Sequence, residues 1–256
     1  MITDVHFVSF SPCGGTEKVM QALGRSIMLS KHEHNITLPK NRLEILQFNE
    51  NDLVFLGFPV YGGRMPRFFS ELISTLQGEN TPLAMVAVYG NREYEGAFLD
   101  MHPAMSAKGF QPIAAVAAIA EHSLSPRIAA NRPDTDDNMK LAEYGTRILE
   151  KARKETNVIE PPGEYPKWKI SSNAAVFVKT DTSLCNTCGA CVKVCPNAAI
   201  PAEAPQTTVV EKCMICAACI KHCPQKARAL GVTQSRKEMA SHLDNAVVRK
   251  EPALFA

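Results

Sequence analysis

The sequence predicts an α/β protein, with a parallel sheet covered by helices on both faces and a second, smaller unit rich in cysteine. Over residues 1–155, short apolar runs alternate with stretches of helical periodicity, and this alternation is typical of parallel sheets. Eight of the nine cysteines lie between positions 185 and 223, beyond the last of these stretches. A proline-rich segment with Pro161, Pro162 and Pro166 lies between the two parts and indicates a crossover between domains.

Each predicted element has its own signal. Four runs rich in branched or aromatic residues indicate buried strands, at residues 5–10, 52–58, 83–89 and 112–119, and a weaker run at residues 35–38 supplies a fifth strand. Helices are predicted where apolar residues recur every three or four positions, at residues 16–30, 66–76, 93–108 and 134–154. The last of these begins with aspartates and ends with lysines and arginines, as the helix dipole favours.

Composition excludes several classes of function. The apolar fraction of 45% is ordinary for a globular protein, and no apolar run is long enough to cross a bilayer, so we expect no membrane insertion. The formal net charge of +2 favours neither nucleic acid nor an anionic membrane as a partner. The first residues lack the pattern of a secretion signal, so we expect a cytoplasmic protein.

Two cysteine strings carry the most specific chemical signal. Each reads C-x2-C-x2-C-x3-C-P, the spacing of bacterial 4Fe–4S proteins, in which a cubane cluster takes four thiolates. Zinc sites usually have paired C-x2-C motifs, often with histidine, and do not account for the repeated three-cysteine run and its proline. Disulfides require an oxidising compartment. We therefore favour iron–sulfur clusters over both alternatives.

Over residues 180–232 the chain resembles the bacterial two-cluster ferredoxins. This resemblance implies a small α+β domain with two 4Fe–4S clusters and crossed ligation, in which the fourth cysteine of each string binds the cluster held by the other string. The first cluster is then expected on Cys185, Cys188, Cys191 and Cys223, and the second on Cys213, Cys216, Cys219 and Cys195.

Three loops after predicted strands resemble the FMN-binding loops of flavodoxins, which implies a five-stranded parallel sheet of order 2-1-3-4-5 over residues 1–155. The first loop would hold the FMN phosphate at a helix N-terminus, the second would lie on one face of the flavin ring, and the backbone of the third would contact its pyrimidine edge. The residues implied are Ser11, Cys13, Gly14, Gly15 and Thr16; Pro59, Val60, Tyr61 and Gly62; and Tyr89, Gly90, Asn91, Arg92 and Tyr94.

The first loop departs from the flavodoxin pattern. Pro12 lacks an N–H donor, Cys13 stands where threonine is usual, and Gly15 replaces an asparagine. A reactive thiol at Cys13 is less favoured than a small loop residue. Likewise, His122 beside Glu121 fits an exposed loop histidine better than a substrate donor, and His222 fits a solvated side chain better than one that tunes a cluster.

The whole chain resembles fusion proteins of anaerobic microbes in which a flavodoxin-like domain (residues 1–155) precedes a two-cluster ferredoxin (180–232). Residues 156–179 form the linker, and residues 233–256 a tail expected to be helical around Met239, Leu243 and Val247. The resemblance implies an electron-transfer protein that relays low-potential electrons between two clusters and an FMN and meets redox partner proteins. The alternatives are a flavin-dependent reductase of a small molecule, with the ferredoxin domain as built-in donor, and a redox sensor. A homodimer, in which one chain's cluster serves the other's flavin, is the alternative arrangement.

Overall fold

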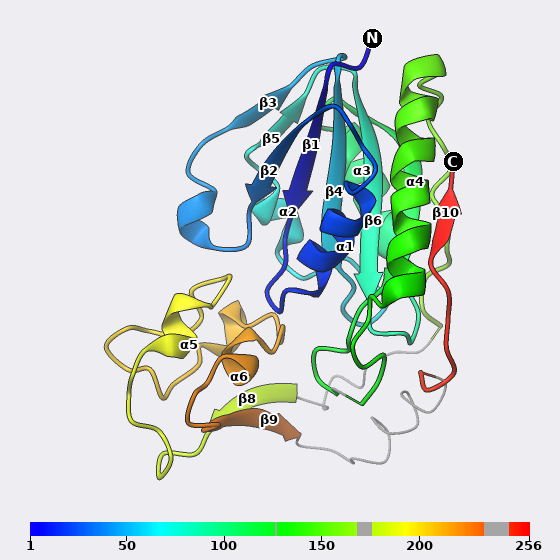
Figure 1. Cartoon of the computed structure of the whole chain (residues 1–256). Helices are drawn as coiled ribbons and strands as arrows, with labels where there is room; N and C mark the ends of the chain where they lie inside the picture. Colours follow the sequence, from blue (N-terminus) through cyan, green and yellow to red (C-terminus); the bar gives the residue numbers. More distant parts are fainter. Residues whose placement is uncertain (126, 168–175, 233–245) are drawn as a thin grey trace.

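The computed structural model describes residues 1–125, 127–167, 176–232 and 246–256. Its larger unit is built on a sheet with the strand order β2-β1-β4-β6-β7-β10 (Figure 1). The first five of these strands are parallel, and β10 is antiparallel to β7. Counted along the chain, the parallel strands lie in the order 2-1-3-4-5, which confirms the predicted fold. The strands are β1 (Asp4–Ser9), β2 (Ser30–Asn35), β4 (Asp52–Pro59), β6 (Thr81–Tyr89), β7 (Phe110–Ile119) and β10 (Ala253–Phe255).

Helices cover both faces of this sheet. α1 (Gly15–Leu23) and α4 (Thr135–Lys154) pack on one face, and α2 (Phe69–Leu72) and α3 (Ala97–Ser106) pack on the other (Figure 1). Successive residues of β4 alternate between the two layers, so that Phe55 lies in the α1 layer and Leu56 in the α2 layer, both fully buried. None of the described helices is long and apolar enough to span a membrane.

The long helix α4 begins with a capping box and packs closely against α1. The Asp134 carboxylate accepts a hydrogen bond from the Asp137 backbone N–H (3.1 Å), and the Asp137 carboxylate accepts one from the Asp134 N–H (3.0 Å), forming a capping box. Farther along, Gly145 faces the end of α1, where a Cβ atom would lie only 2.0 Å from the Leu23 carbonyl oxygen. The two helices can therefore pack this closely only because Gly145 has no side chain.

Two predicted elements near the N-terminus have different bounds in the structure. α1 ends at Leu23 instead of residue 30, because Gly24 packs against the ring of Phe7, and the chain then turns back toward the sheet. The following strand β2 begins at Ser30, before the predicted residues 35–38. It occupies the edge of the sheet and is largely exposed, so it lacks the apolar run by which the other strands are predicted.

Two further helices are shorter than predicted. Of residues 66–76 only α2 is helical, because the chain at Leu76 enters β5 (Leu76–Gly78), which pairs with β3 (Leu46–Phe48) in a separate two-stranded sheet. α3 begins at Ala97 instead of residue 93, because Glu95 takes a left-handed backbone conformation (φ 43°) that interrupts a helix. The pairing partner of a short strand lies far away in sequence, so local periodicity does not reveal it.

The smaller unit contains the cysteine strings. β8 (Val176–Thr180) pairs antiparallel with β9 (Arg228–Val232), and each string carries one short helix, α5 (Ala190–Lys193) or α6 (Ala218–Lys221). β8 begins before position 180, inside the predicted linker. Two 3-10 turns, η1 (Pro39–Asn41) and η2 (Val210–Lys212), complete the described elements. In Figure 1 the smaller unit lies beneath the carboxyl ends of the parallel strands, which is the edge where ligands bind in this class of fold.

The end of the chain returns to the larger unit. The predicted tail helix falls mostly on residues 233–245, which lie outside the described residues. The final segment forms β10, a sixth strand that extends the sheet beside β7. This strand was not predicted, because three apolar residues near a chain end carry no periodic signal.

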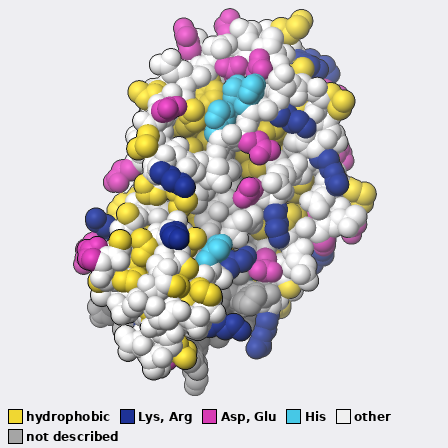
Figure 2. Space-filling view, turned by 60° about the vertical axis from the view of Figure 1, so that its left-hand side comes forward, with side chains coloured by type: hydrophobic (Ala, Val, Ile, Leu, Met, Phe, Trp, Pro, Cys, Tyr) yellow, Lys and Arg dark blue, Asp and Glu magenta, His cyan; other side chains and the backbone are white. Residues whose placement is uncertain are grey.

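A polar cluster lies on the β1–β2 edge, remote from the cysteines. His6 Nδ1 lies 3.1 Å from His34 Nε2, the His6 ring stacks on that of His32 at 4.7 Å, and His6 Nε2 lies 3.5 Å from Asp52. Figure 2 shows histidine side chains gathered on this face beside acidic ones. Burial is the first cause that lowers the pKa of both His6 and His34. Among the described residues, no three His, Cys, Asp or Glu side chains gather closely enough to hold a single metal ion.

Candidate cofactor sites

The two cysteine strings fold into matching loops. In the first, Thr187 and Gly189 have left-handed backbone conformations, and in the second Ile215 and Ala217 have them at the matching positions. In each string the second of these residues precedes the short helix, α5 or α6. Such a turn brings three closely spaced cysteines to one side of the backbone, as a loop that wraps one cluster requires.

Each loop encloses one cavity together with the last cysteine of the other string. One cavity, here called cavity 1, is lined by Cys185, Cys188, Cys191 and Cys223. The other, cavity 2, is lined by Cys195, Cys213, Cys216 and Cys219. The structure therefore brings together the same two sets of four cysteines that the ferredoxin resemblance implies. Four thiols around an enclosed space fit a cubane cluster, which takes one thiolate per iron.

Hydrogen bonds and charge around the cavities favour thiolates. The backbone N–H groups of Ala199 and Ala227 donate to the sulfurs of Cys195 and Cys223 at 3.2 and 3.3 Å. Burial raises the pKa of Cys219 to about 11, and the guanidinium of Arg228 opposes this shift. Arg228 is itself buried and donates to the Pro205 and Thr207 carbonyls. Because buried thiols resist ionisation, cluster binding would supply the free energy that releases their protons.

Cavity 2 lies directly against the first predicted FMN loop. The Cys13 thiol donates to the Cys216 carbonyl at 3.1 Å, and Lys221 Nζ donates to the Cys13 carbonyl at 3.1 Å. Lys221 also lies 3.8 Å from the Glu121 carboxylate. Burial raises the pKa of Cys13 to about 11, so its thiol stays protonated and acts as a donor. This supports the interpretation of Cys13 as a loop residue in preference to a reactive thiol.

Further contacts hold the same side of the smaller unit in place. Arg42 donates to the carbonyl of Pro196 at 2.9 Å. Pro196 directly follows Cys195, which lines cavity 2. Met214 and Ala218 are buried in the core layer that also contains Phe69 of α2. The cysteines of cavity 1 are more exposed. Cys188 is exposed, and the described residues that line cavity 1 all belong to the smaller unit. Cavity 2 is thus the one in contact with the larger unit.

The first loop itself has the geometry of a helix N-terminus. Ser11 Oγ accepts a hydrogen bond from the Glu17 N–H at 3.0 Å, and the Ser11 N–H donates to Thr37 Oγ1 at 2.8 Å. Gly14 has φ +83°, and a Cβ atom built on it would meet nothing within 4 Å. A left-handed glycine beside open space at the start of α1 fits the approach of an anion to backbone N–H groups.

The second loop is a tight turn packed on the smaller unit. The backbones of Tyr61 and Arg64 exchange two hydrogen bonds (3.1 and 3.2 Å) around Gly62 and Gly63, both with positive φ. Burial raises the pKa of Tyr61 well above its usual range, and the nearby thiols of Cys216 and Cys13 add to this shift. The predicted ring-stacking residue therefore lies where the second loop, the first loop and cavity 2 meet.

The third loop is bound by the C-terminal tail. Asn91 Nδ2 donates to the Ala246 and Val248 carbonyls at 2.5 and 2.7 Å, and Asn91 Oδ1 accepts from the Lys250 N–H at 3.1 Å. Lys250 Nζ donates to the Arg92 carbonyl and lies 2.5 Å from the Glu93 carboxylate. The side chain of Asn91 is consequently engaged by the tail, a contact that sequence reasoning missed because the two segments are far apart along the chain.

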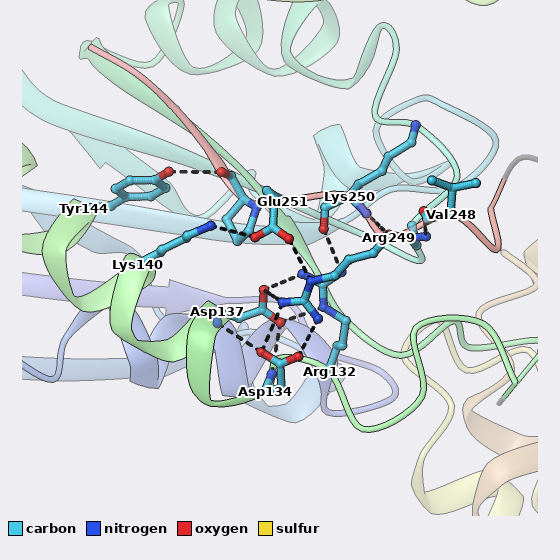
Figure 3. A network of polar contacts seen from close by, with 11 residues as sticks. Arg132, Asp134, Asp137, Lys140, Tyr144, Val248, Arg249, Lys250 and Glu251 are labelled. Atoms are coloured by element: carbon cyan, nitrogen blue, oxygen red, sulfur yellow. Dashed lines mark hydrogen bonds and ion pairs between the residues drawn. The ribbon is translucent and has the colours of Figure 1, made fainter.

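A polar network continues from this loop to α4 (Figure 3). Arg132 Nε donates to Asp137 Oδ2 at 2.7 Å, and Arg132 Nη1 donates to the Lys250 carbonyl at 2.8 Å. Both members of the Arg132–Asp137 pair are buried, at 5% and 0% side-chain exposure. Around them, Arg249 pairs with Asp134 at 2.7 Å. This network anchors the tail across the ligand-binding edge of the sheet.

The remaining predicted residues near this edge have structural contacts. His122 packs against Gly90, its Nδ1 lies 3.2 Å from the Leu124 N–H, and burial lowers its pKa, so the ring stays neutral and orders its own loop. Arg92 pairs with Glu95 at 2.7 Å. Tyr94 packs edge-on against aromatic neighbours, namely Tyr89, Phe98 and Phe255.

Comparisons with known proteins found an iron–sulfur family model and several flavoprotein structures that resemble parts of this chain. Residues 177–224 match the family model of the 4Fe-4S dicluster domain, whereas no curated protein sequence matches the chain. Among solved structures, a flavodoxin from the domain Archaea covers 59% of this chain and 99% of its own (16% identity, TM-score 0.42). The flavodoxin of Streptococcus pneumoniae TIGR4 has the same coverage (15%, 0.39), and an azoreductase from Bacillus anthracis covers 59% and 98% (14%, 0.32).

The order of the parallel strands, β2-β1-β4-β6-β7, defines the fold of the larger unit. The chain joins a flavodoxin-like α/β unit to a ferredoxin-type iron–sulfur segment. An iron–sulfur segment of this kind indicates redox electron transfer.

Proposed function

We propose that this protein carries electrons within one chain, between two 4Fe–4S clusters in the smaller unit and one FMN in the larger unit. The observation that carries this proposal is the contact between cavity 2 and the first loop, where the Cys13 thiol meets the Cys216 carbonyl at 3.1 Å. Tethering two redox centres in one chain replaces a diffusional encounter with a high effective concentration. A fixed contact between them adds orientation to that advantage.

The clusters would be held by the eight cysteines in the two sets that line cavities 1 and 2. When bound, iron–sulfur clusters supply one-electron redox chemistry at a potential set by hydrogen bonds, charge and exposure. The Ala199 and Ala227 N–H groups would tune that potential by donating to ligand sulfurs. The exposed side of cavity 1, with Cys188, would meet the redox partner protein.

FMN would bind with its phosphate on residues 11–16, at the open space beside Gly14 and the N-terminus of α1. Tyr61 and the backbone of the third loop would flank the ring, because the Asn91 side chain is engaged by the tail. When bound, FMN supplies exchange between one-electron and two-electron chemistry. Residues of this chain would orient the flavin and keep water from it.

The composition of the purified protein tests the cofactors. Anaerobically purified protein is expected to contain about eight irons, eight sulfides and one FMN per chain, since each cubane has four irons and four sulfides. Metal, sulfide and flavin analysis measures all three. Zinc in place of iron, or no FMN uptake at saturating FMN, would contradict the respective assignment.

Lys221 offers a sharper kinetic test, because the chain contains a matched control. Lys221 binds the Cys13 carbonyl, whereas Lys193 occupies the matching position in the first string and has no ion-pair partner among the described residues. We expect Lys221→Ala to slow flavin reduction by photoreduced clusters on the order of tenfold, through loss of one charge-assisted hydrogen bond. Lys193→Ala should leave the rate unchanged.

Flash photoreduction over a wide range of protein concentration completes this test. A rate independent of concentration supports transfer within one chain. A rate that scales with concentration would refute the internal route and would point to a homodimer in which one chain's cluster serves the other's flavin. Equal rates in the two lysine variants would show that cavity 2 is not the exchange point.

The second candidate function is a flavin-dependent reductase that uses the ferredoxin-type unit as its donor. The specific observation in its favour is an open cleft of about 650 Å³ that borders both Tyr61 and Cys213. A turnover screen with reduced ferredoxin or flavodoxin and candidate acceptors separates this enzyme from a carrier. Sustained consumption of one acceptor would establish the reductase.

A further inference from the structure

The cleft lies where the loop of cavity 2 meets the larger unit. Its walls come from the second loop and the start of α2, from α3, from Tyr165 of the crossover, and from residues 213–215 of the second cysteine string. A volume of about 650 Å³ is within the range of clefts that hold small ligands. Cys213 lines both this cleft and cavity 2, so a ligand in the cleft would lie beside the second cluster.

The walls of the cleft suit a flat, apolar ligand. They carry aromatic rings and thioethers, namely Tyr61, Phe68, Tyr165, Met65 and Met214. Aromatic faces favour stacking, and methionines adapt their shape to flat ligands. Phe68 has a left-handed backbone (φ 66°), which is uncommon for a bulky residue and clusters at ligand sites in proteins. The fold therefore holds this ring in place at some cost in backbone strain.

The charge of the cleft comes from two arginines with different partners. Arg64 forms a bidentate ion pair with Asp100 (2.7 Å for both bonds) and stacks over Tyr165 at 4.6 Å. Its charge is therefore neutralised. Arg67 lies over the Phe68 ring at 4.5 Å, and no described carboxylate lies within ion-pair distance of it. The cleft thus presents one guanidinium whose charge is not paired within the described part of the chain.

We propose that this cleft binds a flat aromatic compound that carries one anionic group, with its ring system between the aromatic walls and its anion on Arg67. Arginine suits this role because its planar guanidinium both stacks on rings and binds carboxylate, sulfonate or phosphate oxygens. The inference deepens the second candidate function, since it gives a reductase a place for an electron acceptor beside the second cluster. Binding itself requires no flavin, so it can be tested whether or not that function holds.

The direct test titrates the full-length, cluster-loaded protein with anthraquinone-2-sulfonate. We expect saturable binding to one site, and about tenfold weaker binding to Arg67→Ala, because one charge-assisted contact is lost. Arg147→Ala is the matched control: Arg147 is an exposed arginine on α4, remote from the cleft, and its removal should change nothing. The neutral analogue 2-(hydroxymethyl)anthraquinone should bind the original protein about tenfold more weakly and should not distinguish it from Arg67→Ala.

FMN is also a flat ring system with an anionic group, so it could bind either at the first loop or in the cleft. A second experiment distinguishes these two sites. If FMN binds at the first loop, Gly14→Leu abolishes FMN binding and leaves anthraquinone-2-sulfonate binding intact. Arg67→Ala then leaves FMN binding intact and weakens anthraquinone-2-sulfonate binding about tenfold. If instead Arg67→Ala abolishes FMN binding and Gly14→Leu does not, FMN is itself the ligand of the cleft, and the predicted phosphate loop is wrong. The inference is overturned by no saturable anthraquinone-2-sulfonate binding, or by equal binding to Arg67→Ala.

Discussion

Removal of the Asp137 carboxylate should destabilise the larger unit strongly. In Asp137→Ala, the buried Arg132 guanidinium keeps its charge but loses the two oxygens that it binds, and side-chain exposures of 5% and 0% leave little room for water. Breaking a buried ion pair from one side costs about 3–5 kcal/mol. The free energy of unfolding of a typical domain is about 5–15 kcal/mol, so this substitution removes a large share of it.

The neighbouring Asp136 provides the control for this prediction. Asp136 is exposed in the same helical turn, so Asp136→Ala loses only its interaction with the helix dipole, about 0.3–1 kcal/mol. Urea unfolding followed by circular dichroism, with hydrogen exchange of the α4 amides as a local readout, measures both variants. The double variant Arg132→Met with Asp137→Leu should recover most of the loss, because no charge remains buried. Equal destabilisation by Asp137→Ala and Asp136→Ala would refute the reasoning.

Three further predictions concern other parts of the molecule. Burial lowers the folded-state pKa of His6 and His34, so the unfolded chain binds more protons than the folded one. The free energy of unfolding should therefore be greatest above the unfolded pKa of about 6.5 and should fall as the pH drops below it. Urea midpoints measured at several pH values check this, and a flat profile would contradict it. Gly145→Ala should destabilise by about 1–3 kcal/mol in the same assay despite its better helix propensity, since its Cβ would lie 2.0 Å from the Leu23 carbonyl oxygen. Cys195→Ala should remove the cluster of cavity 2 and spare that of cavity 1, which iron analysis with electron paramagnetic resonance can follow; loss of the cavity 1 cluster alone would disprove crossed ligation.

Sequence patterns predicted the bounds of an element correctly where its signal comes from neighbouring residues. The parallel strands other than β2 lie within apolar runs, and the helix α4 has an Asp-rich start and a basic end, so the predicted bounds of these elements are close to the observed ones. The bounds of β2 and α2 were not predicted. β2 is an exposed edge strand and lacks an apolar run, and α2 is short because the chain then enters β5, whose pairing partner is distant in sequence.

For the cofactor sites as well, the sequence predicted features that depend on nearby residues and not the contacts between distant segments. The repeated cysteine spacing predicts that three cysteines of each set share one tight loop. The resemblance to two-cluster ferredoxins assigns the fourth cysteine of each set to the other string, and the lining of the two cavities agrees with this assignment. The three loops of the larger unit were identified by their resemblance to flavodoxin loops. Each follows a strand in the structure, and their role in FMN binding stays a prediction. The sequence did not predict what these loops contact. Cys13 and Tyr61 lie against the second cysteine string, and Asn91 binds the tail.

The sequence by itself therefore determined the alternation of strands and helices in the larger unit and the two cysteine loops of the smaller unit, because these depend on periodicity and on residues close together in the chain. The order of the parallel strands and the crossed sets of cysteines were implied by the resemblance to flavodoxins and to two-cluster ferredoxins. Only the tertiary structure decided that cavity 2 and not cavity 1 contacts the first loop, that Lys221 and not its counterpart Lys193 makes this contact, and that Arg67 lines an open cleft. The two cysteine strings are nearly alike in sequence, so their motif alone does not distinguish which one docks. Docking depends on shape and on hydrogen bonding between residues that lie far apart in the sequence, and no local pattern encodes that pairing.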